Sequence, residues 1–518
     1  MTANLSRILD WARHRFADKD ALVFEDRRWT YAELHQDVNA LAAGLLARGV
    51  GRGDRVAVLA MNLPEYLILG LALAKTGAVM VPLNHRLHPE EIADVLARSG
   101  AVGLAAETEF AETARALADR LPRLRVLLGL DAMGEGWTGV GALIAAHRGA
   151  EVPDAHLSDD DLQRILFTSG TTSRPKGVRL THGNVNANMN AQVVELALTH
   201  RDRVLNFAPL YHVGGLDIPG YATWYVGATM VLMRRFDARS ILAAIETERI
   251  TGMVMVATML QLIRRLGPDA VGDTGSVRWM IFSQVTPALF RDTLELFPNA
   301  SLVEGYGMTE TCNGVTYLDT AHMLSKQGSV GRPVHGVDVR VVGEDGAEVP
   351  PGTEGEIVVR GAKVCPGYLD DPEADARAFR DGWFHTGDVG RFDEDGYLYV
   401  VDRLKDMIRS GGENVAGPEI EAVLCDHPGV HQAAVVGIAH PTWVEVPAAV
   451  LVAEPGLDPW ALLAHCNSRL GRFKVPKALY LVDELPSNPS GKILKRELRT
   501  GLAQLEPVWV EAGTTPPR

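Results

Sequence analysis

Cysteine is scarce in this chain and is not arranged as a metal site or a disulfide framework. The four cysteines, Cys312, Cys365, Cys425 and Cys466, lie far apart in 518 residues and show no Cys-x-x-Cys spacing. Neither a zinc site nor a set of stapling disulfides is therefore indicated, and the thiols suit a reducing compartment. We expect a cytoplasmic protein.

Long apolar runs and basic stripes are also missing. The N-terminus lacks the apolar core of a signal peptide, and the apolar run at 66–74 stops at Lys75, well short of a membrane span. Acidic residues outnumber basic ones by 65 to 51, and the basic residues are scattered among the acids. This distribution disfavours a nucleic-acid-binding surface. We expect no membrane span and no nucleic-acid partner.

What the sequence does show is an alternation of strands and helices. Residues 30–33 have the form of a capping box, and apolar residues then recur at helical spacing until Gly49. The first βαβ unit is predicted as a strand at 55–60, a buried helix at 64–75 and a strand at 78–82. The alternation recurs from 204 to 256, where a helix is predicted at 215–224.

The length exceeds what one hydrophobic core usually supports, so we expect at least two domains. From Val337 onward, short β-like runs with turn signals predict a barrel or meander. We predict an α/β protein with a large N-terminal domain of two mixed or parallel sheets, flanking helices and a small β-barrel, followed by a small mobile α+β C-terminal domain. The predicted bounds are 1–402 for the N-terminal domain, 403–406 for a hinge and 407–518 for the C-terminal domain.

The stretch from Thr168 to Gly177 is rich in hydroxyl groups and glycine and contains Lys176. Short side chains let backbone N–H groups approach phosphate oxygens, and the lysine adds a positive charge. Pro175 precedes the lysine and Gly177 follows it, so the loop is not the Gly-Lys-Ser/Thr loop of P-loop NTPases. The loop predicts a polyphosphate site, although a plain surface turn has the same composition.

Other segments carry groups that a nucleotide site needs. Tyr306 to Glu310 places a glycine turn, a hydroxyl and a carboxylate together, as a nucleotide–metal site would, although an ordinary turn has the same look. Asp388 lies at the end of a predicted strand, where a carboxylate can accept from ribose hydroxyls or cap a turn. Arg403 could hold a phosphate or ribose, or could form a surface ion pair with Asp402 or Asp406.

Lys492, in Ser490-Gly491-Lys492, stands on a glycine turn near the C-terminus; alone, it could equally be a solvated lysine.

Taken together, these motifs resemble the adenylate-forming superfamily, which includes acyl- and aryl-CoA synthetases. The resemblance runs from about Thr30 to Arg499 and includes six ordered motifs. They are Thr168 to Gly177, Tyr211-His212-Val213-Gly214-Gly215, Tyr306 to Glu310, Thr386-Gly387-Asp388, Asp402-Arg403-Leu404-Lys405-Asp406 and Pro489-Ser490-Gly491-Lys492.

The resemblance implies ATP-dependent activation of a carboxylic acid, of medium-chain fatty or aryl and cinnamic type, to an acyl adenylate. Coenzyme A then takes the acyl group. It implies that ATP contacts come from Thr168, Ser169, Gly170, Thr171, Thr172, Lys176, Tyr306, Thr309, Asp388 and Arg403. Glu310 would bind Mg²⁺, with a weaker contribution from Thr168. Lys492 would bridge the α-phosphate and the carboxylate, and Lys405 would be the hinge residue.

The same resemblance places His212 at the acid pocket. The other predicted lining residues are Phe207, Tyr211, Gly214, Gln284, Val285 and Gly307.

Three departures from the family pattern occur; the first narrows the backbone freedom of the phosphate loop, and the other two leave the acceptor open. Ser173 replaces a usual glycine, Gln284-Val285-Thr286 replaces a Gly-Gly-Ala element, and Ala416-Gly417 precedes Pro418 where an aromatic residue is commoner. The alternatives to coenzyme A are a carrier-protein thiol, an amine, or nitrite activation for diazotisation of an aryl amine. A degenerate nucleotide-binding scaffold is a third class of protein. A carrier protein and a second copy of the chain stay open as partners.

Overall fold

The computed structural model describes residues 4–168, 175–267, 270–282, 287–403, 406–410, 413–440, 443–487, 493–511 and 514. The chain divides into two compact units. The first comprises Met1–Val339 and Val359–His385, and the second comprises Arg340–Val358 and Thr386–Arg518. The predicted hinge at 403–406 and the domain bounds beside it stay predictions.

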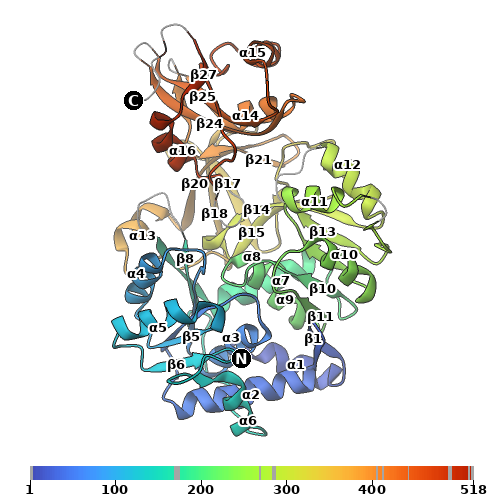
Figure 1. Ribbon diagram of the computed structural model, residues 1–518, viewed down its shortest axis with the longest axis vertical. Helices are drawn as coiled ribbons and strands as arrows, with labels where there is room; N and C mark the ends of the chain where they lie inside the picture. Colours follow the sequence, from blue (N-terminus) through green and yellow to red (C-terminus); the bar gives the residue numbers. More distant parts are fainter. Residues whose placement is uncertain are drawn as a thin grey trace. The chain divides into compact units, whose positions relative to one another are not determined.

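Two mixed sheets form the first unit (Figure 1). Within the described residues, one sheet has seven strands, in the order β7 (Thr138–Gly139), β6 (Val126–Gly129), β5 (Gly103–Ala106), β3 (Arg55–Leu59), β4 (Val79–Pro82), β8 (Leu162–Thr168) and β9 (Lys176–Thr181). All neighbours are parallel except β8 and β9, which form an antiparallel pair.

The other sheet has nine strands in the described part of the chain. Their order is β16 (Arg332–Pro333), β15 (Asn313–Leu318), β14 (Ser301–Met308), β13 (Trp279–Phe282), β12 (Gly252–Val254), β10 (Arg203–Asn206), β11 (Thr229–Leu232), β1 (Asp20–Phe24) and β2 (Arg27–Thr30). The five pairs between β14 and β1 are parallel, whereas the pairs β1–β2, β14–β15 and β15–β16 at the two ends of the sheet are antiparallel. The prediction of two mixed sheets is therefore confirmed.

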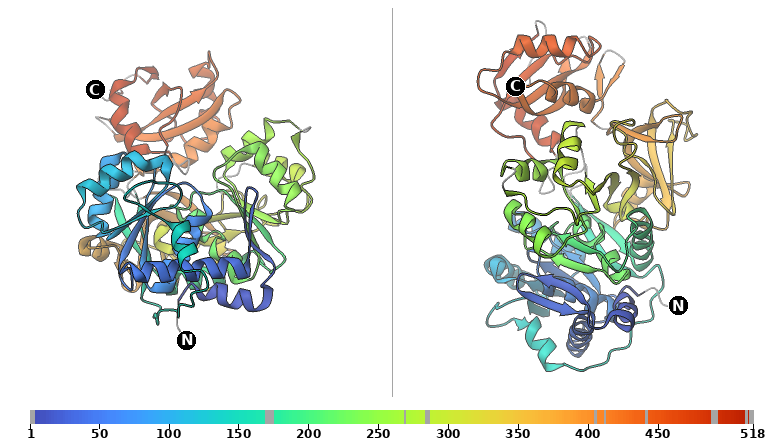
Figure 2. Two further views of the ribbon diagram at one scale, coloured as in Figure 1. Left: turned by 60° about the horizontal axis from the view of Figure 1, so that its bottom comes forward. Right: turned by 90° about the vertical axis from the view of Figure 1, so that its right-hand side faces the viewer.

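Helices cover the sheets and supply much of the core. They are α1 (Arg7–Phe16), α2 (Tyr31–Ala47), α3 (Pro64–Thr76), α4 (Pro89–Ser99), α5 (Ala111–Arg120), α6 (Val140–Ala146), α7 (His182–Glu195), α10 (Ala238–Thr247), α11 (Ala257–Arg264), α12 (Pro287–Leu296) and α13 (Pro372–Ala378). Helix α3 is buried on almost every side, as expected for a helix that is apolar all round. Figure 2 shows α1 and α2 in dark blue, and the two helices pack against each other.

Local sequence signals explain several of these boundaries. Thr30 caps α2: its side chain accepts from the Glu33 backbone N–H, and the Glu33 carboxylate accepts from the Thr30 N–H, so the predicted capping box is confirmed. Helix α3 begins at Pro64 and ends before Gly77, which adopts a left-handed conformation.

The prediction of one helix at 215–224 is wrong. Two short helices occupy this region, α8 (Val213–Asp217) and α9 (Tyr221–Tyr225). Pro219 has no N–H to continue a helix, and Gly220 has a φ of 44°. A side chain at Gly220 would overlap the Leu216 carbonyl oxygen, at 1.7 Å from the Cβ position. The apolar residues of this region are instead buried in two short helices, which the break at 219–220 separates.

Residues 337–403 form a third sheet of five strands within the described chain. It contains β17 (Val337–Val342), β18 (Gly355–Gly361), β20 (Trp383–Phe392) and β19 (Phe379–Arg380) in that order, and β21 (Leu398–Arg403) pairs with β20. Gly346 and Gly396 turn the chain in left-handed conformations at two of the predicted turns.

The C-terminal part of the second unit is α+β, as predicted. Its sheet runs β23 (Glu413–Val415), β22 (Ile408–Ser410), β25 (Val444–Ala453), β26 (Ala478–Leu481) and β27 (Pro507–Val510), with β24 (Val430–His440) paired to β25. Helices α14 (Gly417–Cys425), α15 (Pro459–Asn467) and α16 (Lys495–Gly501) accompany it.

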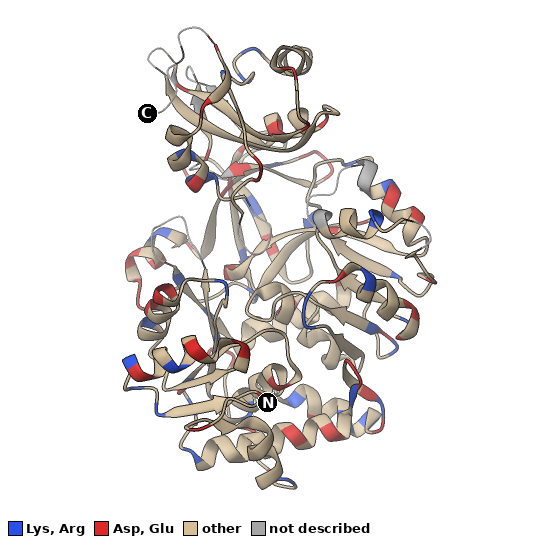
Figure 3. Cartoon of the chain, viewed as in Figure 1, with Lys and Arg blue, Asp and Glu red and all other residues tan. Residues whose placement is uncertain are grey.

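Charged residues of both signs are interspersed over the described elements in the view of Figure 3. Among the described residues, no helix is both long and apolar enough to cross a membrane.

Candidate functional site

The β8–β9 hairpin holds both ends of the predicted phosphate loop. Thr168 and Lys176 lie directly opposite each other as the last and first residues of the paired strands. Both are partly exposed. The loop residues Ser169, Gly170, Thr171, Thr172 and Ser173 lie outside the described residues. The structure therefore fixes the base of the loop, and its role in binding phosphate stays a prediction.

The Tyr306–Glu310 motif spans the end of β14 and a single turn of 3-10 helix, Thr309–Thr311. A bulge between Tyr306 and Gly307 interrupts the pairing with β15. A side chain at Gly307 would place its Cβ only 2.4 Å from the Asn313 carbonyl oxygen, so this close approach of two backbones requires glycine. Thr309 is buried and Glu310 is partly exposed at the head of the turn.

Tyr368 joins these two motifs, and the sequence reasoning missed it. Its hydroxyl donates to Glu310 Oε1 at 3.0 Å, and the Lys176 ammonium lies 4.7 Å from the centre of its ring. Lys176 and Glu310 thus meet through one side chain. The preceding Gly367 has a φ of 138°, and a Cβ there would come within 2.6 Å of the Asp375 carboxylate, so the close approach of this segment requires glycine.

His212 is positioned as the N-cap of α8, where its Nδ1 accepts from the Gly214 N–H at 3.1 Å. The ring is exposed, yet desolvation by the surrounding protein lowers the pKa of His212 below its ordinary value. The imidazole is therefore neutral near pH 7. Among the described atoms outside the backbone of α8, a methyl group at Gly214 would meet His212 Nδ1 at 3.3 Å, a tight contact with the ring.

The predicted lining aromatics Phe207 and Tyr211 are buried. Phe207 packs edge-on against Phe236, with ring centres 5.8 Å apart, and Tyr211 packs edge-on against His85 at 4.9 Å. Gln284 and Val285 lie outside the described residues.

A buried polar cluster lies beneath these motifs. Arg164, on the same face of β8 as Thr168, pairs with Asp217 at the end of α8. Their side chains are 0% and 1% exposed. Cys312, directly after the Thr309–Thr311 turn, has its sulfur 3.9 Å from Arg164 Nη2. Burial raises the pKa of Asp217, and the charges of Arg164 and Lys363 oppose that rise. The cluster ties together the elements that carry Thr168, His212 and Glu310.

In the second unit, Asp388 and Arg403 lie opposite each other in the β20–β21 pair. Asp388 is buried in the interior of β20, not at a strand end as predicted, because β20 continues to Phe392 along β21. Its backbone N–H donates to Thr386 Oγ1 at 3.1 Å. Asp402 Oδ2 accepts from the Gly417 N–H at 3.0 Å, and Asp406 pairs with Arg499 at 2.8 Å. Lys405 and Lys492 lie outside the described residues.

The donor set fits a magnesium nucleotide better than a metal held by protein alone. No group of three or more His, Cys, Asp or Glu side chains that could hold a metal occurs in the described part of the chain. Mg²⁺ with ATP usually needs only one or two protein oxygens besides phosphates and water. The Glu310 carboxylate and the Thr168 hydroxyl would provide such oxygens.

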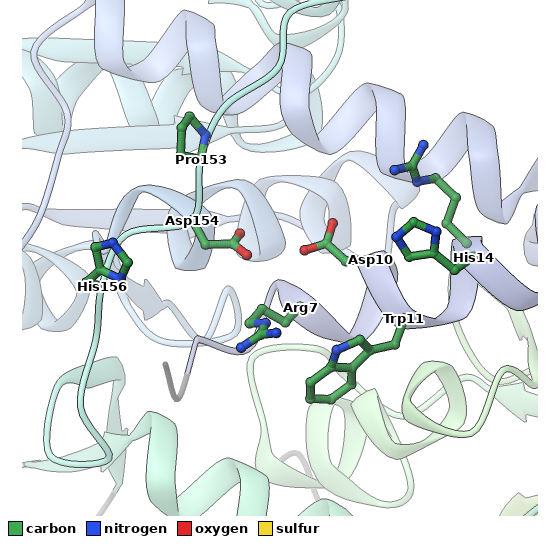
Figure 4. Close-up of a pocket in the computed structure, with 8 residues that line it drawn as sticks. Arg7, Asp10, Trp11, His14, Pro153, Asp154 and His156 are labelled. Atoms are coloured by element: carbon green, nitrogen blue, oxygen red, sulfur yellow. The ribbon is translucent and has the colours of Figure 1, made fainter. Parts of the chain in front are cut away.

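A separate pocket of about 470 Å³ lies between α1 and the segment 153–156 (Figure 4). The Asp10 and Asp154 carboxylates face each other in it. Burial opposes ionisation of Asp10, but the hydrogen bond with His35 and the charge of Lys75 outweigh it and lower its pKa. The pocket contains none of the predicted site residues, and we assign it no role.

Comparison with known proteins gives two family matches. The model of the AMP-binding enzyme matches residues 9–369, and that of the AMP-binding enzyme C-terminal domain matches residues 419–492.

The chain is 44% identical to a feruloyl-CoA synthase of an Amycolatopsis species over 474 residues, 91% of this chain and 93% of that protein. It is 36% identical to a long-chain-fatty-acid–CoA ligase of Mycobacterium tuberculosis over 480 residues, 92% and 93% of the two chains. Among solved structures, the O-succinylbenzoate coenzyme A synthetase of Bacillus subtilis in complex with ATP and magnesium ion superposes with a TM-score of 0.84 at 30% identity, covering 95% of this chain and 99% of that one.

Proposed function

Because the chain belongs to the AMP-binding enzyme family and is an acid–CoA ligase of that family, we propose that its acid substrate is an aryl acid of the hydroxycinnamic type. The reaction uses ATP with Mg²⁺ and coenzyme A. A carboxylate oxygen attacks the α-phosphorus of ATP and pyrophosphate leaves. The thiol sulfur of coenzyme A then attacks the acyl carbon and AMP leaves.

The similarity to feruloyl-CoA synthase carries the proposal on the acid. Identity to that protein is 44%, against 36% to the fatty-acid ligase, over similar lengths of the chain. Gly214, which carries no side chain and lies beside the His212 ring, supports it, because a flat aromatic group needs width next to the imidazole. Phe207, Tyr211, Gln284, Val285 and Gly307 are the other residues that we propose around the acid.

The proposed roles in the nucleotide site follow the charges that the reaction develops. Negative charge on the leaving pyrophosphate needs cations and N–H donors, which Lys176 and the loop from Thr168 to Thr172 would provide. Thr309 would hold the α-phosphate, with Tyr306 beside the nucleotide. Bound Mg²⁺ neutralises phosphate charge, and Glu310 would orient it, with Thr168 as a weaker ligand.

Residues of the second unit would complete the chemistry. Asp388 and Arg403 would hold the ribose, and Lys492 would place its ammonium between the α-phosphate and the acid carboxylate during adenylation. Lys405 in the segment 403–406 would be the hinge about which the domain 407–518 turns before thioester formation. A carrier protein and a second copy of the chain remain candidate partners.

An acid panel tests the proposal. Initial rates of thioester formation with ferulate, 4-coumarate, cinnamate, octanoate and palmitate should give a kcat/KM for the hydroxycinnamic acids at least about tenfold above that for either fatty acid. A preference for octanoate or palmitate would show that the acid class is wrong and leave the ligase reaction intact.

A further inference from the structure

Tyr368 is the one described side chain found to contact both Glu310 and Lys176. It is 5% exposed and belongs to the segment between β18 and α13. Its hydroxyl lies 3.0 Å from Glu310 Oε1, and its ring face lies 4.7 Å from Lys176 Nζ. A carboxylate proposed for the metal and an ammonium proposed for the phosphates therefore share one neighbour.

The surrounding backbone fixes where Tyr368 stands. Its own N–H donates to Asp375 Oδ1 at 2.6 Å, and it pairs with Val178 in an isolated antiparallel bridge. The next residue, Leu369, donates its N–H to the Gly177 carbonyl at 2.7 Å. On the other side, the Cys365 N–H donates to the Glu310 carbonyl at 2.7 Å. The segment is thus tied both to the start of β9 and to the turn that bears Glu310.

The chemistry of the hydroxyl suits this place. The phenol O–H donates a hydrogen bond to Glu310 Oε1 at 3.0 Å. A hydrogen bond to one carboxylate oxygen fixes the rotation of the carboxylate plane, as outer partners do for many metal ligands. The ring face attracts the Lys176 ammonium and limits its range of positions.

We propose that Tyr368 is a positioning residue that orients Glu310 toward the magnesium ion and Lys176 toward the same polyphosphate. This inference rests on the roles proposed above for Glu310 and Lys176. It assigns a separate effect to each part of the side chain: the hydroxyl orients the Glu310 carboxylate, and the ring limits the positions of the Lys176 ammonium.

Two substitutions separate these contributions. Tyr368→Phe keeps the ring and removes the hydroxyl, so the Mg²⁺ concentration for half-maximal adenylation should rise about tenfold while the KM for the acid is unchanged. Tyr368→Leu removes both groups, so the KM for ATP at saturating Mg²⁺ should rise as well. Calorimetric titration of ATP at low and high Mg²⁺, without acid, provides a readout independent of turnover. ATP binding should be weakened at low Mg²⁺ in Tyr368→Phe, and at both Mg²⁺ concentrations in Tyr368→Leu.

Matched variants make the outcome decisive. Tyr480→Phe, which removes another buried hydroxyl, should leave every parameter at the wild-type value. Glu310→Gln should raise the Mg²⁺ requirement, and adding Tyr368→Phe to it should have no further effect. A wild-type Mg²⁺ requirement in Tyr368→Phe, with a raised one in Glu310→Gln, would overturn the positioning role alone. An unchanged requirement in both would overturn the proposed role of Glu310.

Discussion

Arg164 and Asp217 form an ion pair that is excluded from solvent and connects the strand of the phosphate loop to the helix capped by His212. Burying two charges is costly, so such a pair persists only when each charge has the other as its partner. Here Gln163 and Cys312 add contacts to the guanidinium. The pair therefore anchors two motifs that are distant in sequence.

Removing one member of this pair should be strongly destabilising. Asp217→Ala leaves the guanidinium buried without its partner and should cost about 3–5 kcal/mol of unfolding free energy, measured by urea denaturation. The double substitution Arg164→Met with Asp217→Leu should recover most of that loss. Asp273→Ala removes the exposed partner of Arg249 and should leave the midpoint of the urea unfolding transition unchanged. Equal losses in the single and double variants would contradict an ion-pair origin.

Burial of His182 should make the first unit less stable in mild acid. Desolvation lowers the pKa of His182 from 6.5 to about 4, and its Nδ1 accepts from the Leu5 N–H at 3.1 Å. The unfolded chain takes up a proton below pH 6.5 that the folded chain refuses until about pH 4. Stability should therefore fall through this window, by about 2 kcal/mol at pH 5 relative to pH 8.

The pH effect is measured by comparing unfolding midpoints of the wild type and His182→Gln from pH 8 to pH 4. The variant should lose less stability in the window, whereas His335→Gln, which changes an exposed histidine, should follow the wild type. If the unfolding midpoints of all three proteins fell equally between pH 8 and pH 4, the assignment to His182 would be contradicted.

A methyl group at Gly214 should act on the acid and not on ATP. Its Cβ would lie 3.3 Å from His212 Nδ1 and displace the ring that we propose beside the acid, so Gly214→Ala should lower kcat/KM for a hydroxycinnamic acid about tenfold with little change in the KM for ATP. Gly141→Ala, where the Cβ would meet no described atom outside the backbone of its own helix within 4 Å, is the matched control. Equal effects on acid and ATP would place Gly214 outside the acid pocket.

Lys492 should matter for one half-reaction only. Lys492→Ala removes the ammonium proposed to bridge the α-phosphate and carboxylate, so adenylation should fall by about 10²–10³-fold. Conversion of a chemically prepared acyl adenylate to the thioester should continue at close to the wild-type rate. Equal loss of both half-reactions in stopped-time assays would refute the proposed exchange of roles by the C-terminal domain.

Much of the fold follows from local sequence signals, because capping and strand periodicity act over a few residues. The Thr30 capping box and the buried helix predicted at 64–75, found at Pro64–Thr76, are examples. The predicted helix at 215–224 is wrong because apolar spacing alone does not decide a helix: Pro219 lacks the N–H of a helical hydrogen bond, and Gly220 has a positive φ.

The contacts that build the site could not be predicted in the same way. Tyr368 meets Glu310 and Lys176 only because three segments converge, and nothing near Tyr368 in the sequence reports that convergence. Arg164 directly precedes the apolar run 165–167 of β8, and its partner Asp217 lies 53 residues further along the chain, so the pair is identified only in the folded structure.

The most direct test of the account is acid-dependent exchange of labelled pyrophosphate into ATP by the full chain with Mg²⁺ and no coenzyme A. A reaction through an acyl adenylate predicts exchange with ferulate alone, and addition of coenzyme A should then release AMP and feruloyl-CoA in equal amounts. Absence of exchange until coenzyme A is added, or release of ADP and phosphate in place of AMP and pyrophosphate, would contradict it.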